Sequence, residues 1–189
     1  MEASDLKALY DEVRKRMDAA VEHVQHELAG VRSGRASTAL LDGVQVDAYG
    51  AMMPLNQVAA LSIPEPTMIV AQPFDPSLLA GIEKAIRAAN LGLNPSNDGK
   101  LVRIPLPPLT DERRKELSRH VHKLAEEGRN ATRQVRRDAN DRLKKMLKER
   151  LVSEDEERRG LDEVQKITDR HIHEIDDLQK KKDQDLLGR

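Results

Sequence analysis

The 189-residue sequence contains no cysteine and no tryptophan, and its aromatic residues are limited to Tyr10, Tyr49 and Phe74. The absence of cysteine excludes disulfides, thiolate nucleophiles and thiolate metal sites, and it suits a reducing compartment. The scarcity of aromatic rings gives little support to a surface on which nucleic-acid bases stack. No apolar run approaches the ~18 residues that a membrane-spanning helix requires. We therefore expect a cytoplasmic protein that has no membrane partner.

The motifs of several common enzyme families are also missing. The sequence has no glycine-rich phosphate loop, no Gly-x-Ser-x-Gly and no His-Glu-x-x-His, which are the signatures of nucleotide, hydrolase and zinc sites. His23 and His26 have the spacing of two ligands on one helix face, but no carboxylate geometry makes the pair specific, and surface histidines are the better explanation. The acidic run Glu154–Glu157 stands at an expected helix start, where negative charge favours the helix dipole. We expect no catalytic residue, no metal site and no cofactor, and hence no enzyme.

Charge is unevenly distributed along the chain. Charged residues make up 34% of the sequence, and the formal net charge is -1. Lys and Arg number 4 against 7 Asp and Glu in residues 1–31, 6 against 6 in 32–110, 14 against 8 in 111–151, and 8 against 12 in 152–189. Only the third segment is basic, with a net charge of 14 − 8 = +6. Many charges and few aromatics are typical of long solvated helices around a thin core.

The spacing of apolar residues predicts three long helices. Apolar residues recur three or four positions apart over residues 6–31, 111–151 and 161–178, which marks one buried side on each helix. The second helix is expected to end near Val152, because Ser153–Glu156 forms a capping box that opens the third. A connection this short implies that these two helices are antiparallel neighbours. The stripe of the second helix comprises Leu117, Val121, Leu124, Gly128, Ala131, Val135, Ala139, Leu143, Met146 or Leu147, and Leu151.

Between the first two helices the pattern changes to short runs bounded by proline and glycine. Such runs predict strands rather than helices. One helix is expected within this region, because Asp75-Pro76 supplies a helix start and Asn90–Gly92 a helix end. The strands are predicted over Val44–Tyr49, Val58–Ile63, Thr67–Gln72 and Leu101–Leu106.

The predicted fold class is α+β. Residues 1–32 and 109–189 would form an elongated antiparallel three-helix bundle, and residues 33–108 an inserted small α/β domain that is mostly β with one helix. Only two segments of chain join the parts, one through Ser33 and Gly34 and the other through Pro107 and Pro108. We expect these two linkers to act as a hinge, because few contacts need to cross the boundary between the two parts.

The basic segment is the strongest functional signal in the residues themselves. If Val135 points into the core, ~100° per residue places Arg129, Arg133 and Arg136 between roughly 100° and 160° away. Asn140 falls in the same arc, so these side chains would face solvent or a polyanion. Arg suits bidentate contact with phosphate, and few aromatics favour recognition of the backbone and shape of folded RNA. A solvated face balanced by the acids of the third helix remains an alternative.

Seven segments of the chain carry a further signal. They are Val31–Ser37, Pro54–Gln57, Glu83–Ile86, Asp98–Gly99, Arg103–Thr110, Arg136–Asp141 and Val164–Lys166. In this order they resemble motifs of the ribosome recycling factor family. The resemblance extends over nearly the whole sequence, and several segments are long, so it is more specific than any single short pattern. Two positions depart from the family pattern, with Ser33 where Thr is usual and Thr38 where Pro is common.

This resemblance implies a non-enzymatic translation factor. Members of the family have a three-helix bundle joined by two linkers to a small α/β domain, and they disassemble the post-termination ribosome together with the GTPase elongation factor G. The bundle would bind large-subunit rRNA at the intersubunit face, and the small domain and hinge would meet elongation factor G. We expect a monomer in solution. The rRNA-binding positions implied by the resemblance are Arg32, Arg35, Arg129, Arg133 and Arg136.

Two functions of other classes remain as alternatives. A structural coiled-coil adaptor would use the apolar stripes for protein partners, and its binding would be insensitive to salt. An enzyme housed in the small domain would require a polar pocket there.

Overall fold

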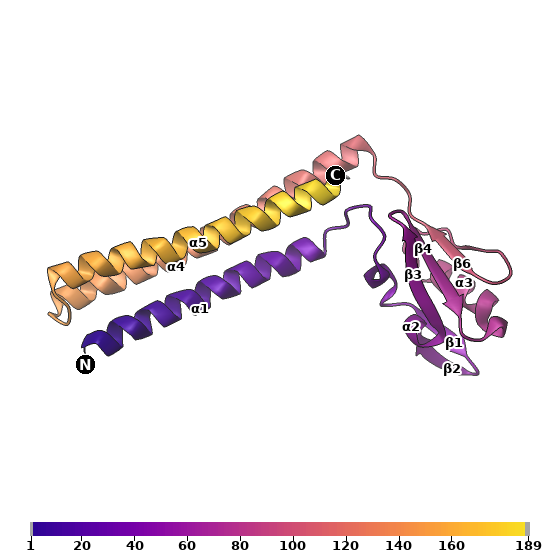
Figure 1. Cartoon of the computed structure of the whole chain (residues 1–189), viewed down its shortest axis with the longest axis horizontal. Helices are drawn as coiled ribbons and strands as arrows, with labels where there is room; N and C mark the ends of the chain where they lie inside the picture. Colours follow the sequence, from indigo (N-terminus) through magenta and orange to yellow (C-terminus); the bar gives the residue numbers. More distant parts are fainter. Residues whose placement is uncertain (1, 188–189) are drawn as a thin grey trace. The chain divides into compact units, whose positions relative to one another are not determined.

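The computed structural model describes residues 2–187 of the chain. Three long helices, α1 (Glu2–Ala29), α4 (Asp111–Lys148) and α5 (Glu154–Leu186), pack against one another and form the bundle. The chain divides after Arg32 and again after Thr110, and the segment between these points forms the small domain. Figure 1 shows the three helices of the bundle running side by side, with α4 and α5 joined by a short connection. The predicted class, long packed helices with a small sheet domain, is confirmed.

The apolar stripe predicted for the first helix lies in the core of the bundle. Leu9, Val13 and Met17 of α1 are at most 3% exposed. They belong to the same buried cluster as Val135 and Leu143 of α4. Because these residues recur every three or four positions, one face of each helix is buried while the other carries charge.

The buried side of α4 differs from the predicted stripe in its centre, and the last residue of that stripe, Leu151, lies beyond α4 and is 45% exposed. The structure buries Thr132 and exposes Ala131, the opposite of what the stripe predicts. The Thr132 hydroxyl donates to the Gly128 carbonyl oxygen at 3.0 Å, so its polar group is satisfied within the helix. At ~100° per residue, the buried positions are centred roughly 40° to one side of Val135. The reason is that α4 packs against both α1 and α5, so one residue does not define the direction of the core.

The connection between α4 and α5 begins earlier than the predicted helix end near Val152. Arg150 has a φ of 57°, in the left-handed region. The N–H of Leu151 donates to the Met146 carbonyl at 2.9 Å, and the N–H of Arg150 to the Leu147 carbonyl at 3.0 Å. This pair of bonds is the Schellman arrangement, which satisfies the last carbonyls of a helix. A left-handed position filled by arginine rather than glycine leaves no signal in the sequence.

The capping box predicted at the start of the third helix is confirmed. The Ser153 hydroxyl accepts from the Glu156 N–H at 3.2 Å, and the Glu156 carboxylate accepts from the Ser153 N–H at 2.7 Å. Two otherwise unpaired N–H groups at the start of α5 are thereby satisfied. The chain reverses between these caps, and α5 returns along α4.

The small domain contains a four-stranded antiparallel sheet and a separate two-stranded hairpin. The sheet order is β3-β4-β6-β5, and the hairpin pairs β1 with β2. Its helix α3 packs against β1, β5 and β6, and the core includes Val46, Ile69, Ile82 and Ile104. The elements are β1 (Gln45–Ala48), β2 (Ala51–Pro54), α2 (Leu55–Val58), β3 (Ala59–Glu65), β4 (Met68–Pro73), α3 (Leu79–Ala88), β5 (Ser96–Asn97) and β6 (Val102–Pro105), with 3-10 turns at Thr38–Leu41 and Pro76–Leu78.

The four predicted strands and the predicted helix of this domain are present, with shifted ends. The Asp75 carboxylate accepts from the Ser77 N–H at 2.9 Å, and Asn90 ends the helix with a φ of 53°. The strands β2 and β5 were not predicted, and the short helix α2 is a second helix where the sequence predicted one. Tyr49 and Gly50 both have positive φ, 56° and 83°, and two such residues make the turn that folds β2 back onto β1.

Gly128 is a point of close approach between α4 and α1. A Cβ atom at this position would lie 2.2 Å from Cγ2 of Val24. The added methyl group would overpack this contact at a usual cost of about 1–3 kcal/mol, and the better helix propensity of alanine would offset about 1 kcal/mol of that cost. We therefore expect Gly128→Ala to lower the free energy of unfolding of the bundle by up to about 2 kcal/mol. Urea unfolding followed by far-UV circular dichroism measures the difference.

Gly81 provides the matched control for this substitution. It lies inside α3, is exposed, and has no heavy atom within 4 Å of a built Cβ. Gly81→Ala should therefore stabilise its own domain by about 0.4–1 kcal/mol. If both alanine variants were stabilising, the close approach of α1 at Gly128 would be wrong.

Candidate nucleic-acid interface

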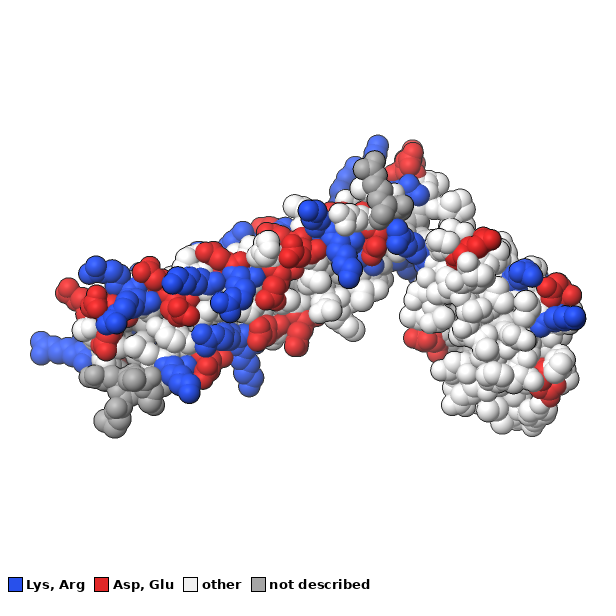
Figure 2. All heavy atoms as spheres, viewed as in Figure 1, with Lys and Arg blue, Asp and Glu red and all other residues white. Residues whose placement is uncertain are grey.

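One side of α4 presents a row of cations to solvent. At ~100° per residue, these positions lie opposite the buried side of the helix, and each of them is exposed or half-buried. Figure 2 shows basic and acidic side chains interspersed along the bundle, whereas the visible surface of the small domain is mostly uncharged. We call Lys115, Arg119, Lys123, Arg133, Arg137, Lys144 and Lys148 the basic face.

Arg129, predicted to face solvent or a polyanion, is buried. It is 8% exposed, so the expectation of a solvent-facing side chain is wrong at this position. Its Nη1 donates to Asp176 Oδ1 at 2.6 Å and its Nη2 to Gln179 Oε1 at 3.0 Å, both on α5. The physical reason is the rotated core of α4, which brings this flank against α5. Arg129 therefore links the two helices.

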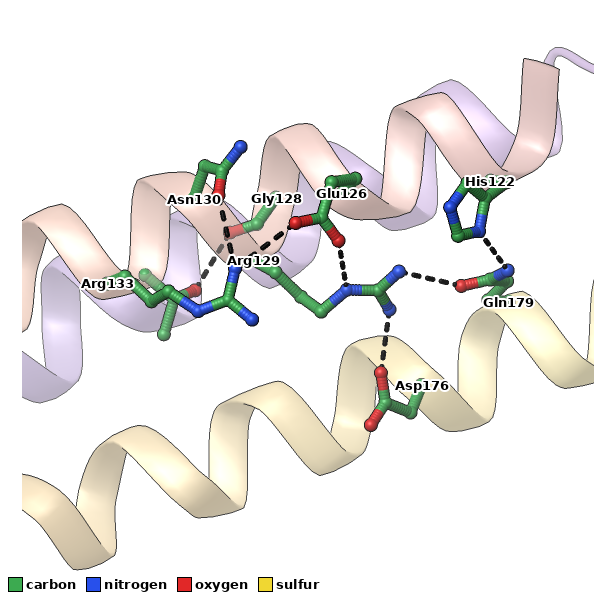
Figure 3. Close-up of polar contacts among 9 residues, drawn as sticks. His122, Glu126, Gly128, Arg129, Asn130, Arg133, Asp176 and Gln179 are labelled. Carbon is green, nitrogen blue, oxygen red and sulfur yellow. Dashed lines mark hydrogen bonds and ion pairs between the residues drawn. The ribbon is translucent and has the colours of Figure 1, made fainter. Parts of the chain in front are cut away.

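The carboxylate of Glu126 connects this buried arginine to the surface. Glu126 Oε2 accepts from Arg129 Nε at 2.9 Å, and Glu126 Oε1 accepts from Arg133 Nη1 at 3.2 Å. Figure 3 shows Glu126 between the two guanidinium groups. Hydrogen bonds from Arg129, then from Arg133, hold the pKa of Glu126 below its ordinary value. Arg129 and Arg133 are thus brought together, one buried and one on the basic face.

Arg136 lies one turn further along α4, on the flank next to α5. The side chain is half-buried, and its Nη1 donates to Gln165 Oε1 at 3.3 Å. Gln165 in turn donates from Nε2 to Asp169 Oδ1 at 2.8 Å. Arg136 is therefore partly held by α5 but is not buried as Arg129 is.

Charged residues on the other flank of α4 form ion pairs with α1. Arg16 Nη2 donates to Asp138 Oδ2 at 3.0 Å, and Arg142 donates to the carboxylate of Glu12. Hydrogen bonds from Gln134 and then Arg16 hold the pKa of Asp138 below its ordinary value. These charges connect helices of the bundle, which distinguishes them from the basic face.

Arg32 and Arg35 flank the boundary between the two parts of the chain. Both are exposed, Arg32 just after α1 and Arg35 near the start of the small domain. Between them, Gly34 has a φ of 76°, and a Cβ there would lie 2.8 Å from Cγ of Leu109. A side chain at Gly34 would thus be strained both by its backbone conformation and by contact.

Three residues of this interface were not predicted from the sequence. Glu126 could have been found, because it stands three residues before Arg129 and so shares its helix face. Asp176 and Gln179 lie on α5, and no local pattern shows which residues of α5 stand opposite Arg129. The register between the helices is needed for that assignment.

The chemistry available at this interface is the binding of anions. Guanidinium and ammonium groups make charge-assisted hydrogen bonds to phosphate oxygens. Within residues 2–187, no group of three or more His, Cys, Asp or Glu side chains is placed to hold a metal ion. Over the same range, no helix combines the length and apolar character needed to cross a bilayer.

Comparison with known proteins identifies relatives over nearly the full chain. The sequence model of the family described as ribosome recycling factor matches residues 24–187. A ribosome-recycling factor of Thermus thermophilus is 52% identical over 183 residues, which cover 97% of this chain and 99% of the relative. One of Symbiobacterium thermophilum is 49% identical over 181 residues, 96% of this chain and 98% of the relative.

Two solved structures are also similar. A solution structure of the ribosome recycling factor is 42% identical, covers 98% of each chain and superposes with a TM-score of 0.73. The T. thermophilus ribosome recycling factor, described with Escherichia coli elongation factor G on the post-termination complex, is 52% identical, with a TM-score of 0.63. That match covers 97% of this chain and 99% of the other. The family model, the relatives and the structures agree, and this chain belongs to the ribosome recycling factor family.

Proposed function

We propose that this protein acts in the cytoplasm as a monomeric translation factor that disassembles the post-termination ribosomal complex together with elongation factor G. Membership of the ribosome recycling factor family supports this function. Further support is the 52% identity to the T. thermophilus factor that has been described with elongation factor G on that complex. In this proposal the GTPase supplies the energy and the chain itself binds no nucleotide.

The basic face is proposed to bind large-subunit rRNA at the intersubunit face of the ribosome. The observation that carries this step is a row of exposed cations on one rigid helix, in a segment with 14 Lys and Arg against 8 Asp and Glu. Phosphate groups of folded RNA are the partner that suits such a row. Arg133 and Arg136 supply phosphate contacts in this proposal, and Arg32 and Arg35 extend them. Arg129 does not contact phosphate in this proposal, because its guanidinium already donates to Glu126, Asp176 and Gln179. Its part is to link α4 to α5 beneath the basic face.

The two linkers are proposed to form a hinge between the bundle and the small domain, which would meet elongation factor G. Ser33 and Gly34 form one strand of this hinge, and Pro107 and Pro108 the other. The left-handed φ of Gly34 supports this role, because it is a backbone conformation that other residues rarely adopt.

Arg136→Ala should weaken binding to purified large ribosomal subunits by roughly tenfold, the value of one charge-assisted hydrogen bond. The slope of log affinity against log salt should also become shallower, by roughly 0.7–0.9 for each phosphate that the variant no longer binds. Arg142→Ala is the matched control, because Arg142 lies on the same helix but pairs with Glu12 of α1. Sedimentation binding over a series of salt concentrations measures both quantities.

Unchanged affinity of the Arg136→Ala protein would remove this residue from the interface. Binding that is insensitive to salt for the unmodified protein would contradict rRNA recognition as a whole. That result would favour a coiled-coil adaptor, which binds protein partners through apolar surface.

Gly34→Ala should slow ribosome splitting several-fold while leaving the bundle folded. A left-handed φ costs a non-glycine residue roughly 1–2 kcal/mol, and the new Cβ would contact Leu109, so the linker would leave its present conformation. Gly43→Ala is the control, because that position has open space and no positive φ. Light scattering of post-termination ribosomes with elongation factor G and GTP measures the rate. Equal rates for the two variants would argue against a hinge at Gly34.

A further inference from the structure

We propose that Glu126 is a positioning residue that holds Arg133 in the orientation in which it binds an rRNA phosphate. This inference rests on the proposed function of the basic face. Glu126 is an acid within a surface that is proposed to bind a phosphate. From its charge alone, its carboxylate would be expected to weaken that binding. The contacts around Glu126 give the reason (Figure 3).

A chain of hydrogen bonds that begins on α5 holds Glu126 in place through Arg129. Asp176 and Gln179 hold the guanidinium of Arg129 at 2.6 Å and 3.0 Å. Gln179 is itself 3.1 Å from His122 Nδ1. Arg129 then donates from Nε to Glu126 at 2.9 Å. Because the Arg129 side chain is only 10% exposed, this arrangement ties Glu126 to a buried arginine that links α4 and α5.

Glu126 in turn restrains one end of the Arg133 guanidinium. Arg133 Nη1 donates to Glu126 Oε1 at 3.2 Å and to Asn130 Oδ1 at 3.1 Å. Within the part of the chain that the structure describes, its Nη2 and Nε make no hydrogen bond to protein. One edge of the guanidinium is thus held while two donors remain for a phosphate, which is the geometry of bidentate recognition.

The magnitudes favour positioning over repulsion. A single carboxylate about 8 Å from a phosphate in screened water weakens binding by roughly twofold or less. Ordering one flexible side chain on binding weakens it by about two- to tenfold. By ordering Arg133 before binding, Glu126 therefore strengthens phosphate binding by more than its negative charge weakens it.

Glu126→Ala should lower the affinity for purified large ribosomal subunits by about three- to fivefold. Glu127→Ala is the matched control. Glu127 is the next residue of the same helix, and it is exposed, with no polar partner for its carboxylate among the contacts of residues 2–187. Its removal deletes the same charge without releasing Arg133, so the affinity should be unchanged or rise by up to roughly twofold.

Two further readouts distinguish positioning from a general structural defect. In an Arg133→Ala background, Glu126→Ala should no longer weaken binding, because the side chain that it orders is gone; the affinity should be unchanged or rise by up to roughly twofold, as in Glu127→Ala. The slope of log affinity against log salt should stay unchanged in Glu126→Ala, because Arg133 still reaches its phosphate. Arg133→Ala should make that slope shallower by roughly one. Circular dichroism checks each fold. If the alanine variant does not fold, Glu126→Gln keeps the size and one acceptor oxygen.

The outcomes separate this inference from the proposed function. If Arg133→Ala and Arg136→Ala both leave the affinity unchanged, phosphate binding by the basic face and the adjacent Arg136 is wrong. If Arg133→Ala weakens binding but Glu126→Ala strengthens it or matches Glu127→Ala, Glu126 is only a nearby acid. If Glu126→Ala weakens binding equally with and without Arg133, the positioning role is overturned.

Discussion

The rotation of α4 about its own axis is the constraint on which the rest of the bundle depends. Gly128 leaves no side chain between α4 and Val24 of α1, so that flank comes close to the first helix. Arg129 reaches Asp176 and fixes the other flank against α5. With both flanks covered, one side of α4 remains for solvent, and it carries the cations of the basic face. A different rotation would bury these charges, which is costly.

Because a buried ion pair adds little net stability, we expect the link through Arg129 to select this arrangement rather than to stabilise it. A buried cation loses its hydration, and hydrogen bonds recover that loss only when its donors are paired. Nε, Nη1 and Nη2 of Arg129 each have an acceptor, on Glu126, Asp176 and Gln179. An alternative register of α4 against α5 would leave the guanidinium buried without these partners. The same contacts that select the register also hold the Glu126 carboxylate against Nη1 of Arg133.

Local signals in the sequence were sufficient for most of the architecture. The apolar stripes located all three long helices, and the capping box at Ser153 placed the start of α5, because both depend only on neighbouring residues. The end of α4 was misplaced, because Arg150 adopts a left-handed conformation that arginine does not signal. The hairpin at Tyr49 was missed for the same reason.

The candidate interface could be predicted only in part. The partial exposure of Arg133 and Arg136 to solvent follows from helical periodicity. Arg129 was misplaced, because a helix between two neighbours has a wider buried side than one reference residue suggests. Its partners on α5 depend on the register between helices, which is a tertiary property. The role of Glu126 emerges only once those partners are known.

The most direct test of the central claim is light scattering of purified post-termination ribosomes mixed with this protein, elongation factor G and GTP. Splitting that requires all three components is the expected result. Ribosome binding without splitting would contradict a recycling function, and no binding at all would contradict the assignment of the basic face to rRNA.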